Sequence, residues 1–499
     1  MQWRKRIGAL CVLVLVLFAA TLAGAAETSF TMAGYDPEDT GHVWDDNLFF
    51  QRRESQSGIH FTFSQFTDSE EWHRTLAGYT EQTIPDVLFK ADLTVSETLS
   101  LYNKGLLIDL RPYLSEAMPN LSALLEAHPD WLSAISLPDG AIVALPTINP
   151  LQSNNIIWVN RTWLNRLGLE MPETAEAFAD MLRAMKTGDP NRNGRADEIP
   201  LTFTGMWDLR YLAHAFGLIG NDYYLEVQDG NVVCDLYQEQ YPAFIQWLHT
   251  LWEEKLIDHN GFSSLDTTRQ ITDTNATITY GVVFGPTALN MVPSSAIGDY
   301  EVLMPMQYEG KRVYRSLLGD VARGTCAISC ACKDPATVLS WIDYLYSEEG
   351  CFLACAGLDG DEYERTSDGA WYWVDDIQTV QDSVLKDATI ADGTALPIYM
   401  PVSYQLQFDD TATRAAVSQI AQLHDVSTFP YPLIYLSDAD REALNAQWLT
   451  LGDFAENGLV WFVTGDRELN DEAWAAYISQ LHEKGMDDII SIFADALNK

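Results

Sequence analysis

The chain alternates short apolar runs with longer segments in which apolar residues recur at every third or fourth position. The short runs are typical of half-buried or buried strands, and the longer segments are typical of amphipathic helices. In the first part of the chain this pattern predicts strands over 29–33, 58–64 and 85–89 and helices over 44–55, 72–81, 95–103 and 120–126. Strands that alternate with helices indicate an α/β fold.

The rest of the chain continues the alternation and then becomes helical. Thr174 is a plausible N-cap for the helix that follows it, and Pro242 suits the first turn of another helix. We predict strands over 142–145, 155–159, 280–284 and 325–329, helices over 162–167, 174–186, 236–256 and 336–347, and a helical C-terminus from 438 onward.

Composition narrows the class of protein. The chain has 499 residues, 47% of them hydrophobic, which is enough for two or three domain-sized units with apolar cores. The formal net charge is −41. A surface of this sign repels phosphate backbones and anionic membrane surfaces, so we expect no nucleic-acid partner.

The N-terminus has the three parts of a secretory signal peptide. Arg4, Lys5 and Arg6 precede the apolar run 7–22, and Ala-Gly-Ala at 23–25 is a small-residue cleavage site. We therefore predict a signal peptide over 1–26 and an exported protein. The alternative is an uncleaved membrane anchor, because the apolar run is about long enough to span a bilayer.

The number and spacing of the cysteines predict a disulfide bond. Cys11 lies in the signal segment, which leaves six cysteines in the exported chain. An even number in an oxidising compartment permits disulfides, and we expect one between the group at 326–332 and the pair at 351–355. A metal site is the alternative, although the alternating faces of a strand over 326–332 do not favour one.

Five segments, in this order and spacing, carry a resemblance to a known family. They are IPDV at 84–87 with KGLLIDL at 104–110, DGAIVALP at 139–146, WLNRLGL at 163–169 with PET at 172–174, GDPNRNGRADEIP at 188–200, and WFVTG at 461–465 followed by Trp474, Tyr477 and Gly485. The chain resembles the family-1 extracellular solute-binding proteins, which deliver sugars to ABC importers. Gram-positive members of that family usually carry a lipobox cysteine after the signal, but here the position is Ala25 or Ala26. Attachment by lipid is therefore not expected, and extracellular, cell-wall-associated and periplasmic locations stay open.

The resemblance implies a type II periplasmic-binding-protein fold, in which two α/β lobes close on a ligand about an interlobe hinge. We expect the chain to cross between lobes near 149–155, 319–324 and 392–398. The N-terminal lobe then comprises 27–150 plus 322–395. The C-terminal lobe comprises 151–321 plus 396–499 and includes the helical C-terminus.

Residues 189–198 predict a calcium loop. Oxygen-bearing side chains alternate as in an EF-hand, and Gly194 stands where such a loop turns sharply. Pro200 replaces the bidentate Glu of a true EF-hand, and Glu198 is the substitute acid. The predicted ligands of a structural Ca²⁺ are Asp189, Asn191, Asn193, the main chain of Arg195, Asp197 and Glu198. The alternative is a polar turn between a helix and a strand.

A sugar site needs flat apolar faces and paired polar side chains, placed at strand ends and between the lobes. Trp207 has Gly205 and polar residues beside it, which makes it the preferred stacking residue; core packing is the alternative for each aromatic. The predicted ligand-binding residues are Asp92, Asn154, Asn155, Trp207, Asp208, Tyr211, Trp371, Trp373, Tyr404 and Gln405.

We therefore expect a non-enzymatic, monomeric substrate-binding component of an ABC importer, with a small-molecule ligand, an oligosaccharide, and permease subunits as partners. Two alternatives stay open. An exported glycan-processing enzyme would use two carboxylates, which 71 acidic residues supply by chance alone. A ligand receptor that feeds a sensor kinase would have the same fold. The sequence has no nucleophile elbow, zinc-protease motif or Walker loop.

Overall fold

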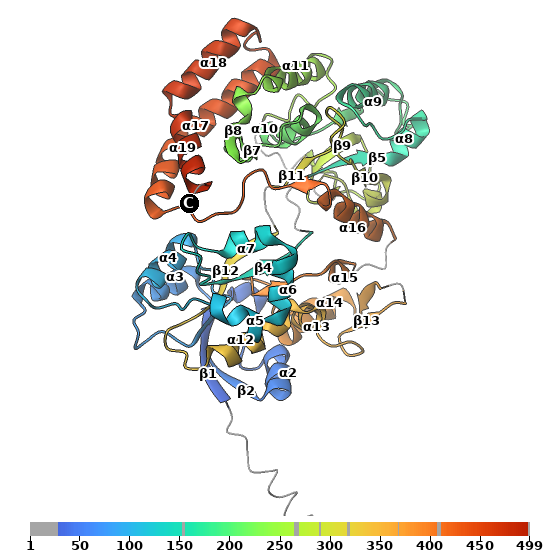
Figure 1. Ribbon diagram of the computed structural model, residues 1–499. Coiled ribbons are helices and arrows are strands. Elements are labelled where there is room, and N and C mark those ends of the chain that lie inside the picture. The colour runs from blue at the N-terminus through green and yellow to red at the C-terminus, as the bar shows by residue number, and fades with distance from the viewer. Residues whose placement is uncertain are drawn as a thin grey trace, which may run out of the picture.

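The computed structural model describes residues 28–151, 155–263, 269–288, 291–316, 320–367, 369–406 and 411–497. These residues form two lobes, each built on its own β-sheet, which confirms the predicted two-lobed α/β fold (Figure 1). The predicted signal segment 1–26 lies outside the described residues. No helix within the described ranges combines the length and apolar character that crossing a bilayer requires.

The N-lobe, drawn below in Figure 1, contains a sheet of six described strands in the order β15-β4-β12-β3-β1-β2. Strand β12 runs antiparallel to both of its neighbours, and the other pairs are parallel. The strands are β1 (Thr28–Tyr35), β2 (Ile59–Phe66), β3 (Val87–Phe89), β4 (Leu145–Ile148), β12 (Val321–Ile328) and β15 (Ile398–Tyr399).

Helices cover both faces of this sheet, and aromatic residues fill the space between the layers. Trp341 packs edge-on against Phe49 and Phe61 with ring centroids 6.1 and 4.9 Å apart. The helices are α2 (Leu48–Ser57), α3 (Ser69–Gly78), α4 (Val95–Asn103), α5 (Leu114–Ala117), α6 (Pro119–Ala127), α7 (Pro129–Ile135), α12 (Pro335–Asp343) and α13 (Glu348–Cys355).

The C-lobe contains a sheet of four described strands in the order β10-β5-β9-β6. They are β5 (Ile156–Asn160), β6 (Ile199–Leu201), β9 (Tyr280–Gly285) and β10 (Tyr300–Val302). Thr174 caps the long helix α9 by accepting from the main-chain N–H of Ala177, as predicted. The remaining helices are α8 (Arg161–Leu167), α9 (Ala175–Thr187), α10 (Met206–Leu209), α11 (Gln240–Glu253), α16 (Thr411–His424), α17 (Asp438–Thr464), α18 (Asp471–Glu483) and α19 (Met486–Leu497).

Two small hairpins, one parallel pair of strands and two short helices complete the fold of the described residues. The hairpins are β7 (Leu225–Gln228) with β8 (Asn231–Cys234) and β13 (Tyr363–Arg365) with β14 (Trp371–Trp373), the parallel pair is β11 (Tyr314–Arg315) with β16 (Ser427–Thr428), and the helices are α14 (Ile377–Thr379) and α15 (Val402–Gln405).

The chain passes between the lobes at three places. It leaves β4 at Ile148 to enter β5, and it returns after β11 to enter β12 at Val321. The third passage was expected at 392–398, and the structure corrects this. Ile398 and Tyr399 pair with β4 in the N-lobe sheet, and the chain reaches α16, which packs beside β10, only after α15. The predicted lobe boundary between 395 and 396 is therefore wrong, because backbone pairing holds this segment in the N-lobe.

The strand directions fix which sheet edges face each other. The first crossover leaves the carboxyl end of β4, and the second enters the amino end of β12. The carboxyl ends of β1 and β3 lie at that same edge because these strands run parallel to β4 and antiparallel to β12. In the C-lobe, the first crossover enters the amino end of β5, so the carboxyl ends of β6 and β9 share the edge that faces the N-lobe.

The cysteines do not form the predicted disulfide. All six cysteines in the described residues are free thiols, and five of them are buried. Cys351 and Cys355 lie one turn apart on α13 with their Sγ atoms 4.0 Å apart. The expected bond between the group at 326–332 and the pair at 351–355 is wrong, since the cysteines of both groups are free thiols.

Candidate ligand-binding site

The N-lobe carries a cavity of about 750 Å³ at the edge that faces the C-lobe. It lies where β1 and β3 end, together with the segment that precedes β15. Ligands of α/β sheets bind at such carboxyl ends. The lining residues are Tyr35, Pro37, Asp39, Thr40, Asp92, Asp392, Gly393, Thr394 and Ala395. Asp92 was a predicted ligand-binding residue, and the structure places it in this wall.

A buried ionic network lies directly beneath this wall. Lys90 Nζ donates to Asp36 Oδ1 at 2.8 Å and to the carbonyl oxygens of Ile390 and Asp392 at 2.8 and 2.7 Å. The other oxygen of Asp36 lies 2.7 Å from His42 Nδ1 and accepts from Trp44 Nε1 at 3.0 Å. The side chains of Lys90 and Asp36 are completely buried, so each depends on its partners for solvation.

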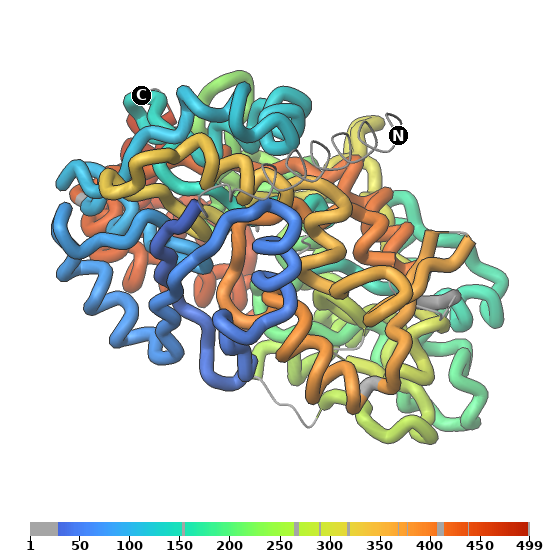
Figure 2. Tube along the Cα trace, turned by 90° about the horizontal axis from the view of Figure 1, so that it is seen from below, coloured from blue at the N-terminus to red at the C-terminus, as the bar shows by residue number. Residues whose placement is uncertain are grey.

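The network fixes three segments that meet at the cavity. Burial would raise the pKa of the Asp36 carboxyl, but the hydrogen bond from His42 and the charge of Lys90 outweigh burial, and the pKa is lowered. Figure 2 shows the blue N-terminal segment beside the orange segment that contains residues 380–400. A Cβ on Gly393 would come within 2.6 Å of Asp36 Oδ1, so this close approach requires glycine. The cavity wall is thereby preorganised.

The C-lobe carries a second candidate surface, which is built around Trp207. This side chain is 38% exposed, which is unusual for a large aromatic residue here. It follows β6 and the Gly205 turn (φ 119°) at the edge that faces the N-lobe. Tyr211 meets its ring edge-on with centroids 5.7 Å apart, and the Arg315 guanidinium lies 5.3 Å from the ring centroid. Trp207 therefore presents a supported aromatic face.

Several predicted residues hold Trp207 in place and are themselves enclosed. Asn155 donates to Asp208 Oδ1 at 2.7 Å, and Asp208 Oδ2 accepts from the N–H and hydroxyl of Thr204 at 2.7 and 2.8 Å. Both Asn155 and Asp208 are 5% exposed, and Tyr211 is 1% exposed. The structure thus brings Asn155, Trp207, Asp208 and Tyr211 together, and of these four only Trp207 offers an open surface. Asn154 lies outside the described residues.

The second predicted aromatic group belongs to a separate cluster in the N-lobe. Trp371 is completely buried, stacks on Tyr404 with centroids 5.5 Å apart, and donates to the Tyr404 carbonyl at 2.6 Å. The prediction that Trp371 binds the ligand is wrong. Its ring is part of the protein core, because Phe352 and Tyr363 enclose it. Trp373 and Tyr404 are half-buried in the same cluster.

Gln405 has a different position from the aromatic residues. Its Nε2 donates to Asn149 Oδ1 at 3.0 Å, which joins the end of α15 to the start of the first crossover. Asp320, at the second crossover, also joins the lobes: it accepts from Trp131 Nε1 of α7 at 2.9 Å and lies 3.0 Å from His424 Nε2 of α16. The interlobe connections are thus held by specific side chains.

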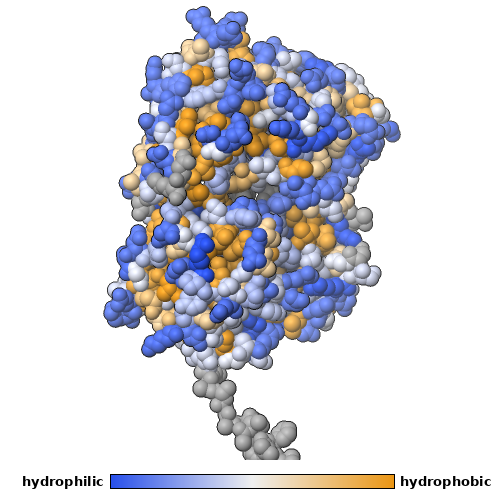
Figure 3. All heavy atoms as spheres, in the orientation of Figure 1, coloured by the Kyte–Doolittle hydropathy of each residue, from blue (hydrophilic) through white to orange (hydrophobic). Residues whose placement is uncertain are grey.

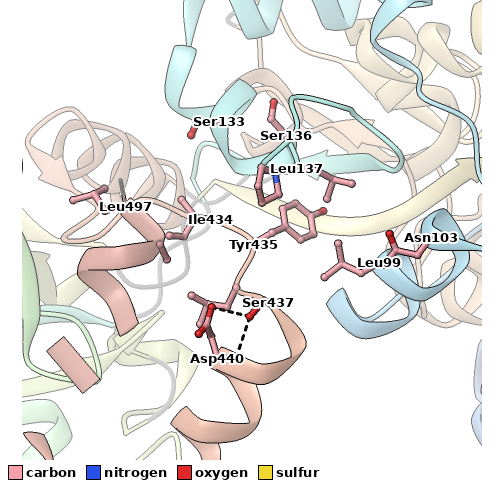
Figure 4. A pocket seen from close by; sticks show the side chains of 13 residues that line it. Leu99, Asn103, Ser133, Ser136, Leu137, Ile434, Tyr435, Ser437, Asp440 and Leu497 are labelled. Carbon is pink, nitrogen blue, oxygen red and sulfur yellow. Dashed lines mark hydrogen bonds between the residues drawn. The ribbon is translucent and has the colours of Figure 1, made fainter. Parts of the chain in front are cut away.

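A further contact between the lobes is made by residues 432–437, which we call the strap. Its Tyr435 is buried in the N-lobe beneath the Arg323 guanidinium, which lies 4.3 Å from the ring centroid. A cavity of about 560 Å³ lies beside the strap (Figure 4), where Tyr435 lies near Leu137 of the N-lobe and Ile434 lies near Leu497 of α19. On the face drawn in Figure 3, the surface narrows where the lobes meet.

The predicted calcium loop is compact. Asn191 and Asn193 reach Asp197 at 3.0 and 2.9 Å, and the carboxylate of Asp189 accepts from the N–H groups of Asn193 and Gly194. Glu198 Oε1 is buried without a hydrogen-bond partner, and burial raises the pKa of this carboxyl. In this loop the amide nitrogens of Asn191 and Asn193 face the Asp197 carboxylate, and Glu198 adds an unpartnered buried carboxylate oxygen. These oxygen-bearing side chains are of the type that a hard cation uses.

Carboxylates alone do not form this site. No group of three or more His, Cys, Asp or Glu side chains in the described part of the chain could hold a metal ion. A cation in the loop would therefore need amide and main-chain oxygens as well, which Asn191, Asn193 and Arg195 carry.

A family model for bacterial extracellular solute-binding proteins matches residues 53–350. The chain belongs to this family. The fructooligosaccharide ABC transporter substrate-binding protein FusA of Streptococcus pneumoniae is 25% identical over 480 residues, which cover 90% of this chain and 86% of FusA.

Solved structures show the same fold. An HMO-binding, ABC-transporter-associated solute-binding protein of Bifidobacterium longum infantis superposes with a TM-score of 0.72 and 19% identity, covering 95% of this chain and 99% of that one. The complex of S. pneumoniae FusA with kestose gives a TM-score of 0.63 and 22% identity over 94% of this chain and 99% of FusA.

Sequence reasoning missed much of the N-lobe wall. Tyr35, Asp39 and Asp392 line the cavity, and Lys90 bonds Asp36 and the main chain of Asp392 beneath them. Two sequence signals were available: Lys90 directly follows a predicted strand and Asp36 comes three residues after another, and Ala-Asp-Gly-Thr at 391–394 is a turn-forming segment. Neither signal says that the two regions meet.

Proposed function

We propose that this solute-binding protein is the substrate-binding component of an ABC importer and that it binds an oligosaccharide between its lobes. The observation that supports the proposal is a pair of unlike surfaces, each at a sheet edge that faces the other lobe. One surface offers the exposed indole of Trp207, and the other offers carboxylates and hydroxyls that lie above a buried ionic network. An aromatic face suits the C–H side of a sugar ring, and carboxylates accept hydrogen bonds from its hydroxyls.

The relatives support this proposal. FusA is a fructooligosaccharide transporter protein and has been solved with kestose, and the Bifidobacterium relative binds HMO. These are binding proteins, so we propose that this chain returns its ligand unaltered. The proposal includes a monomer that works with permease subunits and has no hydrolytic activity.

Titration calorimetry with a panel of neutral oligosaccharides that includes kestose tests the proposal. We expect binding by the wild type and an affinity loss of about tenfold or more for Trp207→Ala, because a buried aromatic anchor carries a large share of binding energy. Trp461→Ala is the matched control, since Trp461 is 42% exposed on α17, outside both walls. Equal affinity of Trp207→Ala and wild type would contradict the assignment of Trp207.

Chromatography of the oligosaccharides after incubation separates binding from hydrolysis. Unchanged saccharides support a receptor. The appearance of shorter products would favour the exported glycan-processing enzyme instead.

We also propose that residues 189–198 hold a structural Ca²⁺. Asp189, Asn191, Asn193, Asp197 and Glu198 would hold it with the Arg195 carbonyl, and a structure of FusA is titled an EF-hand mutant. The ion supplies a positive charge around which the loop's oxygens converge. A chelator should lower the melting temperature of the wild type and leave that of Asp189→Ala unchanged. Identical melting curves with and without chelator would exclude a bound calcium.

A further inference from the structure

We infer that the ligand is an uncharged oligosaccharide and that the N-lobe wall selects against glycans that carry carboxylates, such as uronic-acid oligomers. This inference rests on the proposed function and narrows it. The N-lobe wall is acidic: Asp39, Asp92 and Asp392 line the cavity of about 750 Å³, and all three are exposed. No lysine, arginine or histidine is among the described residues that line it.

The basic side chains near this wall interact with other protein groups and do not line the cavity. Lys90 is completely buried and its three hydrogen bonds go to Asp36 and two carbonyl groups, so its charge balances Asp36. His73 lies between two acids, 2.7 Å from Glu97 and 3.5 Å from Asp92. Lys386 packs its methylenes near Gly41 and does not line the cavity. The three wall carboxylates therefore face the cavity without compensating positive charge in the lining.

Among the described residues, the cation that contacts the Trp207 ring is Arg315, and its side chain is buried. Arg315 is 3% exposed, with its guanidinium 4.0 Å from the Tyr211 ring centroid and a hydrogen bond of 2.9 Å to the Gly220 carbonyl. Arg269 donates to Asp258 at 3.1 Å and to the Phe203 carbonyl at 3.0 Å. Neither guanidinium is presented as the open fork that carboxylate recognition uses.

Between residues 28 and 497, the segments outside the described ranges add no basic residue, since they contain no lysine, arginine or histidine. They contain four aspartates, Asp266, Asp368, Asp409 and Asp410. These segments therefore cannot supply a basic side chain to the ligand.

The three wall aspartates select against negatively charged ligands because they repel a ligand carboxylate. A ligand carboxylate held about 8 Å from an aspartate in a water-filled cavity loses roughly twofold in affinity, and three aspartates together give about tenfold. Neutral hydroxyls avoid this repulsion and gain hydrogen bonds from the same carboxylates. The acidic wall thus favours neutral sugars for two reasons: it repels carboxylate-bearing ligands, and it accepts hydrogen bonds from sugar hydroxyls.

Titration calorimetry of the full-length exported chain at low ionic strength tests the inference. The neutral probes are kestose, nystose, lacto-N-tetraose and maltotriose, and the uronate probes are trigalacturonate and a mannuronate trimer. We expect at least one neutral probe to bind and every uronate probe to bind at least about tenfold more weakly. A uronate probe that binds as tightly as the best neutral probe overturns the inference but leaves carbohydrate binding intact. Absence of binding to all six probes counts against both this inference and the proposed function.

A charge variant gives the second readout. Asp39→Asn, Asp92→Asn and Asp392→Asn combined should narrow the ratio between neutral and uronate affinities by about tenfold. The matched control replaces the exposed acids Asp453, Glu472 and Glu483 on α17 and α18 by their amides, and it should keep the wild-type ratio. An equal change of ratio in both triple variants would assign the selectivity to net charge rather than to this wall and would overturn the inference.

Discussion

Lys90→Met removes the cation of the buried network and leaves an aliphatic side chain of similar length. The Asp36 carboxylate then keeps only His42 and Trp44 as partners, and the carbonyl groups of Ile390 and Asp392 lose their donor. Removal of one partner from a buried ion pair costs about 3–5 kcal/mol, because the remaining charge stays buried without compensation. We expect a loss of this size in the free energy of unfolding of the N-lobe.

Urea denaturation followed by tryptophan fluorescence measures this loss. With a slope of about 3 kcal/mol per molar urea, the midpoint should fall by roughly 1–1.7 M. Lys104→Met, at an exposed C-cap position of α4, is the control and should move the midpoint by less than about 0.2 M. Adding Asp36→Asn to Lys90→Met should recover part of the loss, because the uncompensated buried charge is then gone.

Two results would refute this reasoning. A midpoint shift as small as that of Lys104→Met would show that the Lys90 interactions contribute no net stability. A further loss, instead of a recovery, in the Lys90→Met and Asp36→Asn double variant would show that the buried charge is not the cause.

Two more predictions concern the connections between the lobes. The hydrogen bond that the His424 ring donates to Asp320 raises the pKa of His424. This contact therefore stabilises the fold fully below the unfolded pKa of about 6.5, and the contribution is lost as pH rises through the folded pKa. Asp320→Asn should abolish this pH dependence of the denaturation midpoint between pH 5.5 and 8.5, and a profile that survives would contradict the assignment. Tyr435→Ala removes a buried ring from the N-lobe cluster and should lower stability by about 3–5 kcal/mol and widen the distribution of interlobe distances measured by spin-label spectroscopy. Tyr435→Phe keeps the packing and should behave as the wild type, while an unchanged distribution in Tyr435→Ala would show that the strap does not restrain the lobes.

Elements whose ends are set by neighbouring residues could be predicted from the sequence. Helix α4 spans Val95–Asn103 as predicted, because the capping box of Thr94 and Glu97 defines its start. The strand predicted at 142–145 lies instead at Leu145–Ile148 as β4. Its register depends on pairing with β12, about 180 residues later, and the main chain of Ile142 bonds to the Asp109 side chain and Leu110 instead. No local pattern contains that information.

In the candidate site, too, local sequence predicts some features and distant contacts decide the others. Trp207 and Trp371 have similar local sequence contexts, with aromatic and polar neighbours. Only tertiary packing separates them: Phe352, Tyr363 and Tyr404 enclose Trp371, whereas the indole of Trp207 stays open. The contact of Lys90 with Asp36 spans 54 residues and that with Ile390 spans 300, so the preorganised wall could not be derived from periodicity or spacing.

The position of β12 between β3 and β4 also governs how this protein reaches its native state. The first 150 residues contain β1 to β4, but β3 and β4 are not neighbours, and both present unpaired edges until residues 321–328 have been synthesised. Folding in the order of synthesis therefore cannot complete the first lobe before the second has been made. Truncated chains that end before β12 will leave one edge of β3 and both edges of β4 unpaired and open to aggregation, and the two halves of the molecule must mature together.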